Sequence, residues 1–249
     1  MPKGSRGGTN NSGGITSNVP TNATRMTDAE ANQLRQQQDS SYDANTTAAV
    51  KQYISNTNFD KQGHSMSQTM NFLLDNGVDL QNADLNQINK TYGLRLTSSD
   101  LSSMQFTDAY MSVATHALGK DTVLQRGAHD DMLRNAFGIS DYTQYSESQL
   151  QSKLVGQAFS TTSYMSTSYD ISKNPFLSSS SAVSGGREVV FNIKAGKNTN
   201  VLFGAKSQSE IVIDKGTSFR ITGVRYTGQH ASPRGRGYVP QIELDIETF

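Results

Sequence analysis

Three short stretches of this sequence carry polar side chains whose types and spacing could do chemistry. The stretch AKSQSEIVID places Gln208 and Glu210 two positions apart at the start of an apolar run. Successive side chains of a strand point to opposite faces, so these two polar groups would share one face while Ile211 and Ile213 share the other. Two polar groups are therefore expected to converge on one face of a strand whose other face is apolar.

The second stretch, VLQRGAH, ends an apolar run with Arg126 and Gly127. A guanidinium group offers fixed bidentate donors that match a phosphate, and an adjacent glycine lets a ligand approach the backbone closely. The alternative is a solvated arginine at the end of a strand. Taken alone, Arg126 leaves both interpretations open.

The third stretch, FSTTSYMSTSYD, contains Ser166, Thr167 and Ser168. The period of two puts both serines on one face of a strand. A serine without a general base is a poor nucleophile, and no histidine is near in the sequence. These hydroxyls are better suited to orienting a polar side chain, such as a carboxylate, on a neighbouring strand. An ordinary strand with hydroxyls on one face is the alternative.

Composition limits the classes of protein to which the chain can belong. It has 249 residues, of which 34% are hydrophobic and 18% charged, with a formal net charge of zero. This is enough for one domain of about 200 residues with a core, and it lacks the basic field of a dedicated nucleic-acid-binding protein. Cysteine is absent, which excludes disulfides, thiol catalysis and thiolate metal sites. The four histidines lack the H-E-x-x-H spacing of a helical zinc site, which argues against a metal enzyme.

The elements that must position the polar stretches fall into a helical and a strand-rich half. Residues 1–41 are rich in small polar side chains, and we expect a flexible low-complexity tail there, although Thr27 and Glu30 have capping-box spacing for a short helix. The apolar spacing between residues 43 and 118 is helical. No apolar run of about 18 residues and no signal-like apolar region occur, so we expect neither a membrane span nor a standard secretory signal.

After Lys120 the pattern changes to short apolar runs. These predict strands over 122–125, 188–193, 200–203, 210–213, 218–224 and 241–246, with helices near 130–137 and 147–154. The triplet from Asp214 to Gly216 predicts a hairpin turn between two of the strands. We therefore expect the α+β fold class, with helices first and antiparallel strands after.

The order of the three polar stretches resembles the arginine, serine-threonine-serine, glutamate signature of mono-ADP-ribosyltransferase toxins. The run NIKAGKNTNVLFGAKSQSEIVIDKGTSFRITGV is similar to the closing segment of that family, and AAVKQYIS and TMNFLLDNG are similar to its N-terminal helices. The Gln-x-Glu form after a helical half is most similar to clostridial Rho-modifying exoenzymes. The resemblance covers residues 42–249 and implies one catalytic domain there, with the helical half packed on a two-sheet antiparallel β core.

The resemblance implies NAD as the donor substrate. Nicotinamide leaves, and ADP-ribose passes to an acceptor through an oxocarbenium-like state, with NAD glycohydrolysis as a side activity. By resemblance, Arg126 would bind an NAD phosphate and Gly127 would offer its backbone to the nicotinamide amide. Thr167 and Ser168 would support the strand, and Phe176 would stack on nicotinamide, unless that ring only fixes the loop after the preceding proline.

The resemblance also assigns catalytic roles. Ser166 would hydrogen-bond and orient Glu210, and Glu210 would bind a ribose hydroxyl and stabilise the developing cation. Arginine-modifying relatives carry glutamate at the position of Gln208, which suits an acceptor that must lose a proton. Glutamine is neutral and both donates and accepts hydrogen bonds. An asparagine or glutamine acceptor is therefore implied first, and a nucleic-acid base or sugar second.

The resemblance implies a monomeric bacterial toxin or effector, secreted or delivered into a host cell, with a protein acceptor such as a small GTPase. Rho-modifying members carry an exposed aromatic residue near the glutamine, whereas this chain has Phe203 early in the turn. That departure leaves the acceptor open. Two alternatives remain at this point, namely ADP-ribosylation of a nucleic acid and a non-enzymatic binding or virion-associated module.

Overall fold

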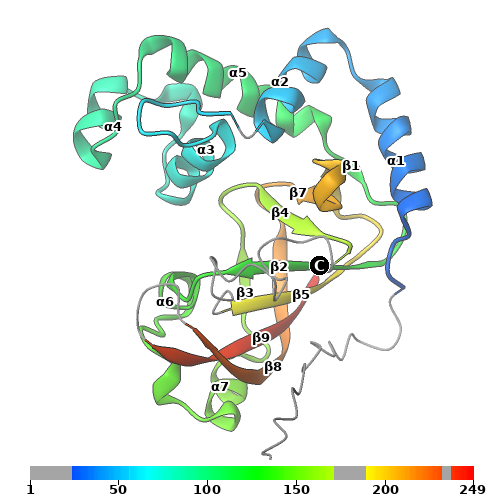
Figure 1. Ribbon diagram of the computed structural model, residues 1–249, viewed down its shortest axis with the longest axis vertical. Helices are drawn as coiled ribbons and strands as arrows, with labels where there is room; N and C mark the ends of the chain where they lie inside the picture. Colours follow the sequence, from blue (N-terminus) through cyan, green and yellow to red (C-terminus); the bar gives the residue numbers. More distant parts are fainter. Residues whose placement is uncertain (1–23, 56, 171–188, 232–236) are drawn as a thin grey trace, which may run out of the picture.

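The structure is a computed structural model, and it describes residues 24–55, 57–170, 189–231 and 237–249. Its α-helices within these ranges are α1 (Asp28–Ser41), α2 (Ala44–Ile54), α3 (Met66–Asp75), α4 (Leu85–Tyr92), α5 (Ser98–Ala114), α6 (Asp131–Phe137) and α7 (Glu147–Leu154). Its strands are β1 (His116–Ala117), β2 (Thr122–Ala128), β3 (Ala158–Ser160), β4 (Met165–Ser168), β5 (Val189–Ala195), β6 (Asn200–Phe203), β7 (Glu210–Ile213), β8 (Ser218–Ala231) and β9 (Tyr238–Thr248). Figure 1 shows α2 to α5 gathered at one end of the molecule, on the side of β4 and β7.

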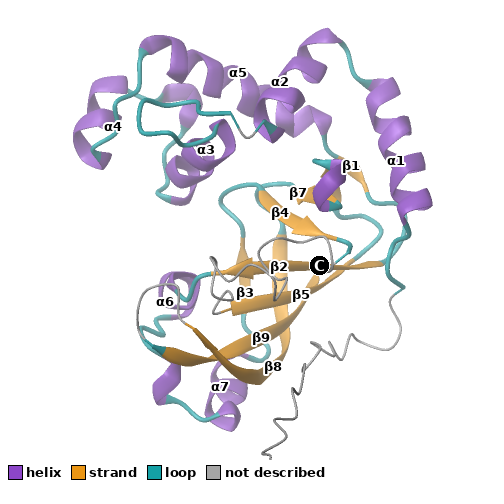
Figure 2. Ribbon diagram, viewed as in Figure 1, coloured by secondary structure: helices purple, strands orange, loops and turns teal. Residues whose placement is uncertain are grey.

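Helices α2 to α5 form a layer with its own apolar core. Capping boxes begin α3 at Ser65 and α5 at Thr97, and Gly93 ends α4 in the left-handed conformation with φ of 66°. The buried side chains of the layer pack against Leu202 of β6 and Val212 of β7. The helical half therefore covers one face of these strands. Figure 2 shows α2 to α5 on the side of β4 and β7, with α6 and α7 at the other end of the sheet. None of the described helices is long and apolar enough to cross a membrane.

The described strands form one hydrogen-bonded sheet in the order β1-β6-β7-β4-β2-β5-β9-β8-β3. A single residue pair, Gln125 with Ser168, joins β2 to β4, so the sheet consists of two halves that meet at this pair. The α+β fold class is confirmed. One detail differs from our expectation of an antiparallel core, because β5 and β9 run parallel.

The turn from Asp214 to Gly216 does not close the hairpin that we expected. Strand β7 pairs with β4 and β6, whereas β8 pairs with β9 and β3, so this turn carries the chain from one half of the sheet to the other. The six strands expected from apolar runs are all present. Strands β1 and β3 had no such signal, because they have only two and three residues and lie largely at the surface.

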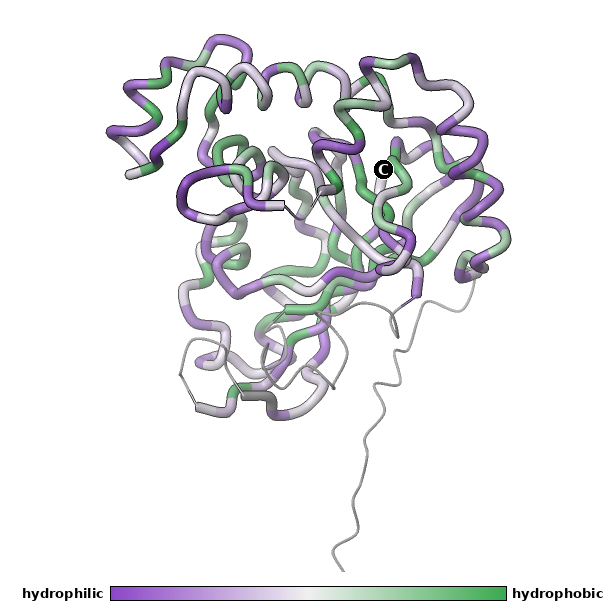
Figure 3. Tube along the Cα trace, turned by 45° about the horizontal axis from the view of Figure 1, so that its top comes forward, coloured by the Kyte–Doolittle hydropathy of each residue, from purple (hydrophilic) through white to green (hydrophobic). Residues whose placement is uncertain are grey.

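The second apolar core lies on the other face of the sheet. Apolar side chains of the central strands pack there against Leu150 and Leu154 of α7 and Leu133 of α6. Ile211 and Ile213 both belong to this core, so their expected common face is confirmed. Figure 3 shows the concentration of hydrophobic residues along the central strands. Each large apolar side chain buried there stabilises the fold by about 2 kcal/mol.

A buried polar network fixes strand β2 within the sheet. The Gln125 amide donates to Asn192 Oδ1 at 2.7 Å, and the Asn192 amide donates to Glu243 at 3.0 Å and Asp245 at 3.2 Å. The Arg225 guanidinium pairs with both carboxylates, and its pKa is raised mainly by Asp245. Buried charges must be paired, and this network pairs them. It also links β8 and β9 to Gln125, the residue that precedes Arg126.

Two contacts at the turn after β7 join the sheet to the helical layer. Lys215 Nζ lies 2.5 Å from Asp108 Oδ1 of α5, and Thr115 donates to Asp214 Oδ2 at 3.0 Å. Lys215 also lies over the ring of Tyr164, 5.5 Å from its centre. The Asp108 side chain is 7% exposed, so a charge-assisted bond here contributes about 2 kcal/mol. Burial raises the pKa of Asp214.

Helix α1 differs from the flexible tail that we expected over residues 1–41. The capping box of Thr27 and Glu30 is present, and the helix continues to Ser41 with Ala31 and Gln38 buried. Gln38 makes two hydrogen bonds to the backbone of β6. The expectation rested on the small number of apolar side chains, whereas this helix is attached to the sheet partly by a buried amide. Residues 1–23 lie outside the described residues.

Candidate active site

Strands β4 and β7 bring the serine-threonine-serine stretch beside the glutamine and glutamate. The register pairs Ser168 with Glu210 and Thr167 with Ile211. The Ser168 hydroxyl lies 3.0 Å from Gln208 O and 2.9 Å from Asp170 O, so its single proton is shared between two carbonyls. The Thr167 hydroxyl donates to Ile211 O at 2.6 Å. Both side chains therefore fix the main chain that carries Gln208 and Glu210.

Glu210 is the first residue of β7 and is half-buried. Its Oε2 accepts a hydrogen bond from the Ala205 amide at 2.8 Å. The Gly204 amide donates to Glu210 O at 3.0 Å, and the Glu210 amide donates to Ala205 O at 3.2 Å. A carboxylate that accepts a main-chain N–H is held in one orientation in its charged form. The turn from Gly204 to Glu210 thus positions a negative charge at one end of the β7 strand.

Gly204 belongs to the candidate site by its close contact with Glu210, and the sequence did not lead us to expect it. A Cβ atom at this position would lie 2.3 Å from Glu210 Oε2 and 2.7 Å from its Cδ, far inside van der Waals contact. The carboxylate therefore occupies the space that a side chain at 204 would fill. An isolated glycine next to an expected strand indicates that another group approaches the backbone closely there. This pattern in the sequence could have predicted the role of Gly204.

Gln208 does not lie on the strand, which corrects the geometry that we expected for it. It ends the short 3-10 helix Lys206–Gln208, and Ser209 follows in the left-handed region with φ of 49° and ψ of 39°. The alternation of faces along a strand therefore does not relate Gln208 to Glu210. Gln208 is half-buried, Ser209 is buried, and Lys206 and Ser207 are exposed on the same turn.

Arg126 reaches the same region from β2. Its Nη1 donates to Ser166 O at 2.8 Å, so the guanidinium lies against the middle of β4. Gly127 follows on β2 and pairs with Val190 of β5. Ser166 was expected to hydrogen-bond Glu210. In the register observed it lies opposite Val212, and Ser168 is the serine opposite Glu210. Phe176 lies outside the described residues.

Tyr53 of α2 is buried in the core of the helical layer. Burial raises the pKa of Tyr53, the Asn71 amide that donates to its hydroxyl at 3.0 Å lowers it, and the charge of Glu210 raises it further. Arg126 also acts on this hydroxyl electrostatically. The phenol is therefore within electrostatic range of both charged residues of the candidate site. It had no signal in the sequence beyond its place in a helical apolar pattern.

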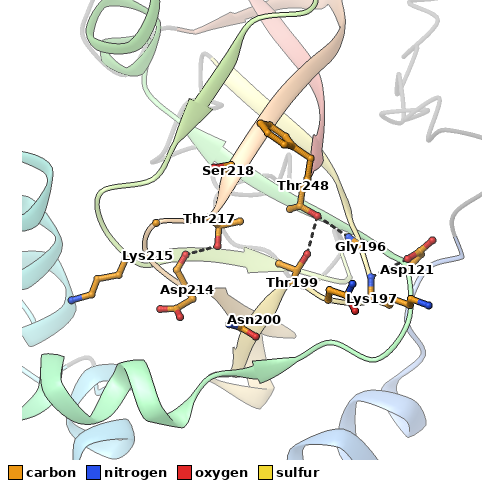
Figure 4. A pocket seen from close by; sticks show the side chains of 13 residues that line it. Asp121, Gly196, Lys197, Thr199, Asn200, Asp214, Lys215, Thr217, Ser218 and Thr248 are labelled. Atoms are coloured by element: carbon orange, nitrogen blue, oxygen red, sulfur yellow. Dashed lines mark hydrogen bonds between the residues drawn. The ribbon is translucent and has the colours of Figure 1, made fainter.

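A cavity of about 530 Å³ lies elsewhere, at the opposite ends of these strands. Figure 4 shows Asp214, Lys215 and Thr217 at one side of it and Thr199 and Thr248 at another. Asp214 directly follows β7, four positions after Glu210, so the cavity and the carboxylate lie at opposite ends of one strand. The cavity lining contains none of the predicted site residues that the structure describes, and the candidate site built from those residues therefore does not lie in it.

Arg126 thus lies on β2, the serine-threonine-serine stretch on β4, and the positioned Glu210 at the start of β7. Residues 120–234 match a family model described as ADP-ribosyltransferase exoenzyme. That segment contains Arg126, the serine-threonine-serine strand and Glu210. The suspected resemblance to mono-ADP-ribosyltransferase toxins is thus confirmed over this segment. A comparison with curated protein sequences gave no significant match.

Solved structures similar to this chain include several such toxins. An ADP-ribosyltransferase from Clostridium botulinum, solved in a triclinic crystal form, has 20% identity and a TM-score of 0.53, with 91% of this chain and 98% of that chain covered. A protein from S. aureus, solved with NAD, has 16% identity and a TM-score of 0.52, with the same coverage. The enzymatic component of the C2-toxin from Clostridium botulinum has 13% identity and a TM-score of 0.56, with 90% of this chain but 48% of that chain covered. At these identities the likeness supports the fold.

Proposed function

We propose that this chain is an NAD-dependent mono-ADP-ribosyltransferase of the toxin type. The observation that carries the proposal is the Glu210 carboxylate, which the Ala205 amide orients next to Gly204, while the Arg126 guanidinium donates to the neighbouring strand β4 and both charges act on the Tyr53 hydroxyl. In cleavage of a dinucleotide, an oriented carboxylate can stabilise the positive charge that develops on the ribose, and an arginine can bind a phosphate through two hydrogen bonds. Similar solved structures contain NAD in one case and NADH in another.

In the proposed reaction the bond between the nicotinamide nitrogen and the ribose carbon breaks, and its electron pair leaves with neutral nicotinamide. The ribose carbon becomes cationic, and a lone pair of the acceptor attacks it while the acceptor loses a proton to solvent. Glu210 stabilises the cation, Arg126 binds the diphosphate, and Gly127 offers its backbone to the nicotinamide amide. One preorganised charge of this kind contributes roughly 10² to 10³ in rate.

The proposed acceptor is an asparagine or glutamine side chain of a protein in a target cell. Gln208 supports this choice because a neutral amide matches another amide in both donor and acceptor. Phe203 is buried, so it does not provide the exposed aromatic residue expected of Rho-modifying members. The exposed residues of the turn are Lys206 and Ser207. We propose monomeric action after delivery into a host cell, with water as the acceptor in a side reaction.

The direct test is to incubate the purified chain with NAD labelled in its ADP-ribose part and to measure nicotinamide release. Adding a host lysate then shows where the label goes. A label that protease removes and nuclease leaves supports the proposal, and mass spectrometry identifies the modified residue. A label that only nuclease removes supports a nucleic-acid acceptor instead. Absence of nicotinamide release with the lysate present contradicts an enzymatic function.

Replacing Gln208 with glutamate is expected to leave NAD cleavage within about threefold of the wild type while lowering transfer to the native acceptor about tenfold. The new negative charge would lie beside a neutral acceptor that has no positive charge to pair with it. A tenfold loss in the transfer rate corresponds to about 1.4 kcal/mol of activation free energy. Both rates are measured on one preparation. Ser207→Glu adds the same charge at the exposed neighbouring position and serves as the control. Equal transfer by Gln208→Glu and the wild type contradicts the role of Gln208.

A further inference from the structure

We infer that Gln38 of helix α1 is a positioning residue for the turn that carries Gln208 and Glu210. The inference deepens the proposed function, on which its kinetic part rests. It concerns a helix outside the matched segment 120–234, in a part of the chain whose composition gave no sign of a catalytic role.

Among the described residues, the edge of strand β6 is only partly covered by its neighbour. Strand β7 pairs with one side of β6, while β1 pairs with the other side through Val201 and Asn200 alone. The pairing with β1 stops at Val201, which lies opposite His116. The edge of β6 at Phe203 therefore has no β1 residue beside it. An uncovered edge leaves main-chain groups without strand partners.

The Gln38 side chain completes this edge. Its Nε2 donates to Val201 O at 2.7 Å, and its Oε1 accepts from the Phe203 amide at 3.0 Å. A primary amide has the same donor and acceptor as a peptide group, so Gln38 acts as one residue of an added strand. It is 6% exposed, so water does not readily replace it. Removing it would leave a buried N–H and a buried carbonyl without these partners.

The main chain fixed by Gln38 continues directly into the site. Phe203 is followed by Gly204, which lies beneath the Glu210 carboxylate, and by Ala205, whose amide donates to that carboxylate. Gly204 and Ala205 are therefore only one and two residues beyond the Phe203 amide that Gln38 holds. A shift of the β6 end would move Gly204 and Ala205 with it.

The other end of α1 contacts the opposite side of the same turn. The Tyr169 hydroxyl donates to Asp28 Oδ1 at 3.0 Å, and the Tyr169 amide donates to Ser209 O at 3.1 Å. Tyr169 is 5% exposed and directly follows Ser168. Helix α1 thus contacts the segments on both sides of the turn, and Gln38 supplies the contact nearest to the carboxylate.

The test compares Gln38→Met with Gln37→Met in the full chain. Methionine preserves length and helix propensity at both positions, but Gln37 is exposed and its side chain makes no hydrogen bond to β6 within the described residues. For Gln38→Met we expect kcat of NAD cleavage to fall about tenfold, with KM for NAD within about twofold, and hydrogen exchange of the Phe203 and Ala205 amides to rise about tenfold. For Gln37→Met we expect none of these changes.

A further control separates positioning from general loss of stability. Leu150→Val in α7 weakens the apolar core without removing a hydrogen bond of the turn, and at a temperature well below melting it is expected to keep the wild-type kcat. An unchanged kcat in Gln38→Met beside an active wild type overturns the inference. Equal amide exchange in the two methionine variants also overturns the inference, whether or not the wild type cleaves NAD. Absence of NAD cleavage by the wild type would instead contradict the proposed function.

Discussion

Glu210→Gln is expected to lower the rate of NAD cleavage by about 10³-fold at saturating NAD while leaving the affinity for NAD within a few-fold. The substitution keeps an oxygen that can accept the Ala205 amide hydrogen, so the turn from Gly204 retains its geometry. In the proposed reaction it removes the negative charge that would stabilise the ribosyl cation as that cation forms, and such a contribution appears in the transition state rather than in substrate binding. The effect is therefore expected in kcat.

Nicotinamide release gives kcat, and calorimetry gives the affinity of the unreactive variant for NAD. Glu247→Gln in β9 removes the same charge outside the candidate site and is the control, with an expected change of less than twofold. A Glu210→Gln variant that cleaves NAD at the wild-type rate would show that the carboxylate does not take part in catalysis. A variant that loses affinity instead of kcat would reassign Glu210 to substrate binding.

The sequence predicted the strands well because their apolar runs are short and continuous. It predicted their partners less well. The triplet from Asp214 to Gly216 has hairpin composition, yet β7 and β8 lie in different halves of the sheet. A turn signal reports local backbone geometry, whereas strand neighbours depend on which apolar faces meet across the whole chain. Parallel pairing of β5 with β9 is a long-range feature of the same kind.

The candidate site shows the same limit at the level of single residues. Residue types and order predicted Arg126, the serine-threonine-serine strand and Glu210. The relation between Gln208 and Glu210 was predicted from strand alternation, which Ser209 breaks by its left-handed conformation. Serine carries no sequence signal for that conformation comparable with glycine's. Gln38 had no signal because its contribution depends on an uncovered strand edge that lies more than 160 positions away in the chain.

Gly204→Ala is the second large effect that we expect, a loss of about 10²-fold in the rate of NAD cleavage. The added Cβ would lie 2.3 Å from Glu210 Oε2, so the carboxylate must move and leave the Ala205 amide. Arg126 is on a different strand and keeps its contact with Ser166 O, so NAD affinity is expected to stay within a few-fold. The clash also lowers the free energy of unfolding by about 1 to 3 kcal/mol.

A double substitution shows whether Gly204 acts through Glu210. If the glycine matters only because it makes room for the carboxylate, Gly204→Ala combined with Glu210→Gln should be no slower than Glu210→Gln alone, since residues that act as one unit are not additive. Gly196→Ala is the matched control, because its Cβ would lie 3.4 Å from Thr248 Oγ1 and away from the site. If the two rate losses multiply in the double variant, Gly204 contributes separately from Glu210. In that case its backbone itself would lie close to the bound substrate.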